Sequence, residues 1–168
     1  MNKSFLKCIL FFAILIFSFN LATSQVRIAV LPFQNMDGEM RLNIWCYKLQ
    51  DSVTNALKEK DPTSKYFYIV PADSVEELVT GLNIDPTNPQ YPSDVWKVIK
   101  AMNVQYVVMG NFNKQVKKIL INAYIYNVRT KLPNNKYQAR DIFLEEPTIL
   151  ESVPVIIKEI IPALIPDK

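Results

Sequence analysis

The stretch VRIAVLPF, from Val26 to Phe33, is apolar at both sets of alternating positions. Neighbouring side chains of a strand point to opposite faces of its sheet, so a stretch of this kind needs cover on both faces. We therefore expect a central strand in a sheet that carries helices on both sides. Pro32 has no N–H to donate, so strand pairing should fade at that residue.

A long amphipathic helix is predicted to follow, over Met40–Lys60. Its apolar residues recur at three- or four-residue spacing: Leu42, Cys46, Leu49, Val53, Ala56 and Leu57. The aromatic and β-branched stretch YFYIVP, from Tyr66 to Pro71, predicts the next strand. A strand, a helix and a strand in this order form a βαβ unit with a right-handed crossover.

Two shorter helices are predicted next. The first ends near Val79 and has Asp73 or Ser74 as its N-cap, and the second covers Asp94–Met102 with Ser93 as its N-cap. The stretch between them, LNIDPTNPQYP, contains three prolines and is expected to be an irregular loop.

From Val104 the pattern changes to consecutive strands, which are predicted over residues 104–112, 118–130 and 136–145. The short connections between them are typical of an antiparallel meander. A last apolar helix is predicted over Val153–Ile161. The sequence therefore predicts an α/β fold: a layered domain with a mixed five-stranded sheet, a βαβ start, an antiparallel meander, and helices packing on the sheet.

The first 24 residues have the pattern of a secretory signal peptide. Lys3 and Lys7 precede the apolar run Cys8–Phe17, and the expected cleavage lies between Ser24 and Gln25. The run of roughly ten residues is shorter than the ~20 that span a bilayer.

Cys8 lies at the start of that apolar run rather than just after it, so a lipoprotein signal is not indicated. We expect residues 25–168 to form a single domain that is periplasmic or secreted. Peripheral association with the outer membrane and homo-oligomerisation both stay open.

The composition argues against several functions. The net charge of +3 includes two leader lysines, so the exported part has a charge near +1, which does not favour nucleic-acid binding. The chain has no histidine, and Cys46 is the one cysteine after the leader, so histidine-based catalysis, zinc sites and an internal disulfide are excluded. We expect Cys46 to be a buried structural thiol, and we expect no cofactor.

Phosphate binding is not indicated by the loop after the first strand, because it has a single glycine, Gly38, between the acidic residues Asp37 and Glu39. We expect this loop to turn into the helix, with Asp37 or Gly38 near the N-cap. Glu145 and Glu146 form a second acidic pair, but neighbouring loop carboxylates are usually solvated. The sequence thus predicts a protein that is not an enzyme.

Candidate partner-binding residues lie in two places. Tyr124, Tyr126 and Tyr137 are on neighbouring predicted strands, where tyrosines offer large contact area and a polar hydroxyl. A covering helix would instead make them core residues. The first loop adds the exposed-loop candidates Asn35, Met36 and Asp37.

Two segments carry a family resemblance: VRIAVLPFQNMDG before a long helix, and VWKVIKAMNVQYVVMGNFNK followed by ILINAYIYNVRT. They resemble the TolB amino-terminal-like domain and its relatives among bacterial envelope proteins, which include the curli-secretion lipoproteins and the lipoprotein activators of penicillin-binding proteins. In that pattern a strand ending in Leu-Pro-Phe opens the domain and a later strand ends in a glycine, here Gly110. The resemblance implies protein–protein contact in the envelope, with no catalytic residues.

Our main hypothesis is an exported, non-enzymatic cell-envelope protein that binds another envelope protein through its sheet edge or exposed loops. A second hypothesis is a small periplasmic hydrolase or glycan-binding protein that uses Asp37, Glu39 or Asp141, with the tyrosines as a stacking platform. A third is a self-assembling secretion component.

Overall fold

The computed structural model describes residues 25–165, and it places six strands and their covering helices within them. The strands are β1 (Val26–Val30), β2 (Gln34–Asn35), β3 (Phe67–Ile69), β4 (Tyr106–Gln115), β5 (Lys118–Asn127) and β6 (Leu132–Leu144). The α-helices are α2 (Ile44–Lys60), α3 (Ala72–Gly81), α4 (Tyr91–Asp94), α5 (Trp96–Met102) and α6 (Ser152–Ile160). Short 3₁₀ helices are η1 (Met40–Leu42), η2 (Glu146–Glu151) and η3 (Ile161–Ala163).

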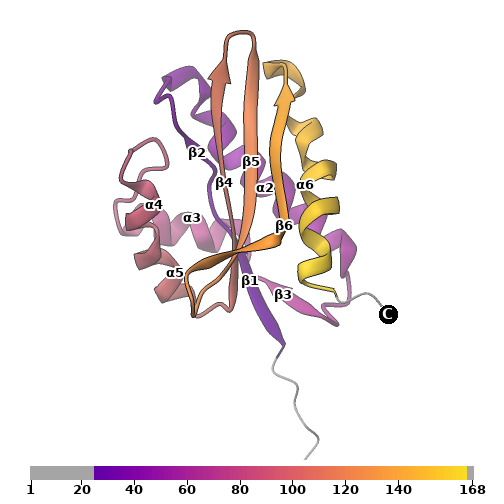
Figure 1. Ribbon diagram of the computed structural model, residues 1–168. Helices are drawn as coiled ribbons and strands as arrows, with labels where there is room; N and C mark the ends of the chain where they lie inside the picture. The colour runs from indigo at the N-terminus through magenta and orange to yellow at the C-terminus, as the bar shows by residue number, and fades with distance from the viewer. Residues whose placement is uncertain (1–24, 166–168) are drawn as a thin grey trace, which may run out of the picture.

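The strands form one mixed sheet in the order β3-β1-β4-β5-β6, and β2 pairs with β4 (Figure 1). Strands β3, β1 and β4 are parallel, whereas β4, β5 and β6 form the antiparallel meander. The predicted α/β class and mixed sheet are therefore confirmed, with β2 as an added short strand. The predicted signal peptide lies outside the described residues.

Strand β1 is central and is covered on both faces, as its double apolar pattern predicts. Ile28 and Val30 belong to the core under α2 and α6, and Ala29 and Leu31 belong to the core under α3 and α5. All four side chains are fully buried. Burying each large aliphatic side chain contributes about 1.5–3 kcal/mol to folding, so this strand supports both layers at once.

Regular pairing of β1 ends before Pro32, and the backbone of Pro32 and Phe33 is hydrogen-bonded to helices instead. The Phe33 N–H donates a 3.0 Å hydrogen bond to the Cys46 carbonyl in α2. The Tyr91 hydroxyl in α4 donates a 2.8 Å bond to the Pro32 carbonyl. The Phe33 ring then lies against Gly110 of β4, where a β-carbon would be 2.1 Å from the ring. Gly110 is thus required by close packing, and it lies inside β4 rather than at a strand end.

Several predicted helix starts are wrong. The long helix begins at Ile44 after η1, and its N-cap residue is Asn43 rather than Asp37 or Gly38. The cause is a contact along the loop: the Asn35 side-chain amide donates to Asn43 Oδ1 at 2.7 Å, which holds the loop outside the helix.

The predicted N-caps Asp73, Ser74 and Ser93 are also wrong, since all three lie inside helices that start without a side-chain cap. Strand β6 begins at Leu132, four residues before its predicted start at Lys136, with register shifts opposite β5. β6 is an edge strand that pairs with one neighbour, β5, and an edge strand can accommodate a proline such as Pro133.

Cys46 is the buried structural thiol that the helix pattern predicts. Its side chain is fully inaccessible in the core under α2 and α6. Burial raises its pKa to about 11. A thiol with this pKa is protonated at neutral pH and is a poor nucleophile.

We predict that Gly110→Ala destabilises the protein by about 2–3 kcal/mol, because the added methyl overlaps the Phe33 ring in a packed core. Thermal or urea unfolding measures the loss. The matched control is Gly81→Ala at the end of α3, where a β-carbon meets nothing within 4 Å, and this variant should be neutral or slightly stabilising. Equal stability of the two variants would contradict the role of the Phe33–Gly110 contact.

Candidate functional site

One face of the sheet is only partly covered by helices. Helices α3 and α5 cover β1 and the start of β4, while the rest of that face lies open; Figure 1 shows α2 and α6 behind β4, β5 and β6. We call the uncovered part the open face. Its residues are half-buried or exposed and comprise Asn111, Asn113, Leu120, Asn122, Tyr124, Tyr126 and Phe143.

Strand register arranges the open face in rows, because residues directly opposite one another share a face. Leu120 lies between Asn113 of β4 and Phe143 of β6. In the next row but one, Tyr124 lies between Met109 and Gln138. The face therefore combines apolar and aromatic side chains with amides.

The two tyrosines of β5 form one aromatic cluster with Trp96 of α5. The rings of Tyr124 and Tyr126 meet edge to face at 6.3 Å between centroids, and Tyr126 meets Trp96 at 6.2 Å. Tyr126 packs against the α3–α5 core, and burial raises its pKa. Both tyrosines are half-buried, so neither the fully covered nor the fully exposed alternative describes them.

A network of amides forms the centre of the open face. The Asn122 side-chain amide donates to Asn111 Oδ1 at 3.1 Å, and Asn122 Oδ1 accepts the Asp141 N–H at 2.9 Å. Asp141 has a positive φ of 57° and lies within a register shift of the β5–β6 pairing, between Ala139 and Ile142. Asn122 therefore links all three strands of the meander.

The first loop, which contains the candidates Asn35, Met36 and Asp37, lies alongside the end of β4. The Met36 N–H donates to the Phe112 carbonyl at 3.0 Å, and the Asp37 carboxylate accepts the Lys114 N–H. Met36 is 59% exposed, whereas Asn35 is 1% exposed and organises the loop from within. Of these candidates, Met36 and Asp37 offer surface to a partner, and the Asn35 side chain does not.

Tyr137 is separate from the other two tyrosines. Tyr124 pairs with Gln138 and not with Tyr137. The β5–β6 pairing is irregular between the Tyr124–Gln138 pair and the Tyr126–Pro133 pair. The Lys136 ammonium lies 4.9 Å from the centroid of the Tyr137 ring. The structure thus places Tyr124 and Tyr126 on the same face of the sheet as Leu120 and Phe143, which were not among the sequence-based candidates.

Of the acidic residues of the hydrolase hypothesis, Asp37 and Glu39 both lie near Lys114 at the end of β4, whereas Asp141 is on a different strand, β6. Glu39 is hydrogen-bonded to Arg41, and this bond lowers its pKa, whereas a general acid needs a raised one. Asp37 is held at β4 and Asp141 at β6. Among residues 25–165, no three Cys, Asp or Glu side chains are grouped as a metal site.

Neither comparison with protein families nor comparison with curated proteins finds a match to this sequence. Comparison with solved structures does find similar chains. Escherichia coli LpoB, determined by NMR, has 13% identity and a TM-score of 0.53 over 74% of this chain and 60% of that one. The LpoB C-terminal domain from Salmonella enterica has 15% identity and a TM-score of 0.49 over 80% of this chain and 92% of that one. TolB from Acinetobacter baumannii has 16% identity and a TM-score of 0.44 over 84% of this chain and 28% of that one.

The similarity to E. coli LpoB confirms the predicted resemblance at the level of the fold. Within the part of the chain that the structure describes, no helix is long and apolar enough to cross a membrane.

We predict that Asn122→Ala destabilises the protein by about 1–2 kcal/mol, because it leaves the Asp141 N–H and Asn111 Oδ1 without their partner. Urea unfolding measures the loss, and amide exchange at Asp141 should become faster. Asn113→Ala, on the same face and outside this network, serves as the control and should change stability by less than about 0.5 kcal/mol. Unchanged exchange at Asp141 would contradict the network.

Proposed function

We propose that this chain is an exported, non-enzymatic cell-envelope protein that works as a protein–protein interaction module, with the open face as its contact surface. The observation that carries the proposal is that helices cover β1 on both sides but leave the aromatic and apolar residues of β5 and β6 half-exposed. The most exposed of the large apolar residues on this face is Phe143, at 48%.

The composition of the open face supports a protein partner. Protein interfaces are enriched in aromatic residues and depleted of charge at their centre. Leu120, Tyr124 and Phe143 supply apolar and aromatic area, and the amides of Asn111 and Asn122 supply hydrogen-bonding groups between them. A sheet surface is also rigid, so binding orders few side chains and costs little entropy.

The expected location follows from the predicted signal peptide and from the envelope role that the TolB amino-terminal-like resemblance implies. In that group the domain contacts other proteins of the envelope. We therefore propose an envelope protein as the partner, in the periplasm or at the outer membrane.

The experiment compares capture of envelope proteins by the tagged protein and by three variants. Leu120→Asp and Tyr124→Asp place a charge in the open face and should reduce recovery of the partner at least about tenfold, as expected for an interface centre. The matched control is Val155→Asp on α6, which is 42% exposed and lies away from the open face, and it should retain capture. Circular dichroism verifies that all variants are folded.

Two outcomes would overturn this proposal in favour of its alternatives. Cosedimentation with purified peptidoglycan that is lost in Tyr124→Asp, without capture of a protein, would indicate glycan binding. A concentration-dependent oligomer in light scattering that Leu120→Asp dissociates would indicate self-assembly through the open face.

A further inference from the structure

Gln25 lies at the surface of the protein, immediately before the first residue of β1. It is exposed, whereas the next residue, Val26, is already paired with Phe67 of β3. The expected cleavage of the signal peptide falls between Ser24 and Gln25. Cleavage at this bond would turn the backbone nitrogen of Gln25 into the N-terminal amine of the exported chain.

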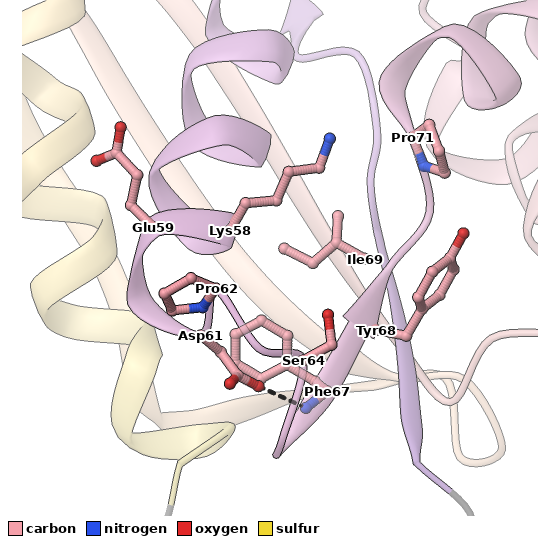
Figure 2. Close-up of a pocket in the computed structure, with 9 residues that line it drawn as sticks. All are labelled: Lys58, Glu59, Asp61, Pro62, Ser64, Phe67, Tyr68, Ile69 and Pro71. Carbon is pink, nitrogen blue, oxygen red and sulfur yellow. Dashed lines mark hydrogen bonds between the residues drawn. The ribbon is translucent and has the colours of Figure 1, made fainter.

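The side chain of Gln25 is hydrogen-bonded to a turn that is fixed from within. Its amide nitrogen, Nε2, donates to the Ser64 carbonyl. The Ser64 N–H donates to the Asp61 carbonyl at 2.9 Å, and the Asp61 carboxylate accepts the Phe67 N–H at 3.0 Å. Figure 2 shows Asp61, Ser64 and Phe67 close together at the start of β3. The amide of Gln25 therefore contacts an ordered turn at the surface.

The bond to Ser64 holds this side chain only loosely. It is exposed to solvent, and a hydrogen bond between neutral groups in water adds little net stability, because water can replace either partner. The regular pairing of β1 begins one residue later, at Val26. The Gln25 side chain can therefore leave the turn and fold back toward its own backbone nitrogen without disturbing the sheet.

An N-terminal glutamine contains both reactive groups of a cyclisation. The uncharged amine attacks the Cδ carbon of its own side-chain amide, and the new bond between this nitrogen and Cδ closes a five-membered lactam. The bond from Cδ to Nε2 breaks, one proton passes from the attacking nitrogen to Nε2, and ammonia leaves. An α-amino group loses its proton closer to neutral pH than a lysine does, and attack within one residue is favoured by proximity.

The position of β1 gives such a lactam a structural consequence. Residues 26–28 are paired with β3, and Ile28 is fully buried in the core under α2 and α6. An aminopeptidase acts on a free α-amino group, so trimming from Gln25 would reach the central strand after one step. A lactam at Gln25 lacks that amine and protects the strand from trimming.

We propose that Gln25 becomes a pyroglutamate residue once the signal peptide has been removed, and that this lactam blocks the N-terminus of the exported chain. The inference rests on the export that the proposed function includes, and it adds a covalent modification. Cyclisation removes the positive charge of the terminal amine. It also removes Nε2 and its bond to Ser64, while the pairing of β1 with β3 and β4 is kept.

Mass spectrometry of the exported protein tests this proposal. The full chain is expressed with its leader, recovered from the envelope fraction, incubated at neutral pH, and cleaved before aspartate to release residues 25–36. This peptide should be lighter than its sequence by the mass of one ammonia, with the loss localised to Gln25 by fragmentation. An aminopeptidase should remove no residue from the cyclised protein.

The matched control is Gln25→Asn, which keeps a side-chain amide but shortens it by one methylene. Its amine would have to close a strained four-membered ring, so the N-terminus should stay free and sensitive to aminopeptidase. Capture through the open face should be the same for this variant and the wild type, because Gln25 is not part of that face.

Three results would overturn the proposal. A peptide that starts at Gln25 and keeps its full mass after incubation would show that the lactam does not form. A different N-terminal residue would remove the reactive amine, and an equal loss of ammonia from Gln25→Asn would assign the loss to another amide. In each case retained open-face capture leaves the proposed function intact, whereas a chain that keeps its leader would contradict export itself.

Discussion

The ring of Phe33 occupies the space that Gly110 leaves free in β4, and the arrangement of the sheet and its helices depends on this contact. Because Pro32 cannot donate to a ladder, the chain leaves the sheet after β1 and returns as β2 beside β4. The break allows Phe33 to enter the core and its N–H to reach the Cys46 carbonyl. One departure from regular pairing thus positions α2 and, through Tyr91, α4.

The same break decides which part of the sheet stays uncovered. With α4 held at the Pro32 carbonyl, the helices between β3 and β4 lie over β1 and the start of β4. The antiparallel meander extends beyond them. Where the two meet, Trp96 of α5 packs against Tyr126, and Tyr91 and Pro92 of α4 line a small pocket together with Asn111 and Tyr124. The open face therefore results from an unequal distribution of helices over the two faces, and the amide network around Asn122 keeps it ordered.

Sequence periodicity predicted the features that depend on local pattern. The double apolar set of β1, the helix face around Cys46 and the strands of the meander are all read from residues close together in the chain. The helix start at Ile44 depends instead on the Asn35–Asn43 bond, which forms only after the loop has folded against β4.

The candidate site was predictable only in part for the same reason. Alternation along β5 placed Tyr124 and Tyr126 on one side, but Phe143 joins them through the β5–β6 register, and irregular pairing separates Tyr137. Asn35 looked like a loop surface residue, yet it is buried because its amide holds the loop together. The position of β3 at the edge of the sheet depends on strand order, which a short apolar stretch does not encode by itself.

We propose that this protein acts through the open face of its sheet. Site-specific photocrosslinking in living cells tests it most directly, with a photoreactive amino acid placed at Leu120 or Tyr124 and, for comparison, at Val155 on α6. We expect a discrete crosslinked protein from the two sheet positions and none from the helix position. Crosslinks from Val155 alone would contradict binding through the open face.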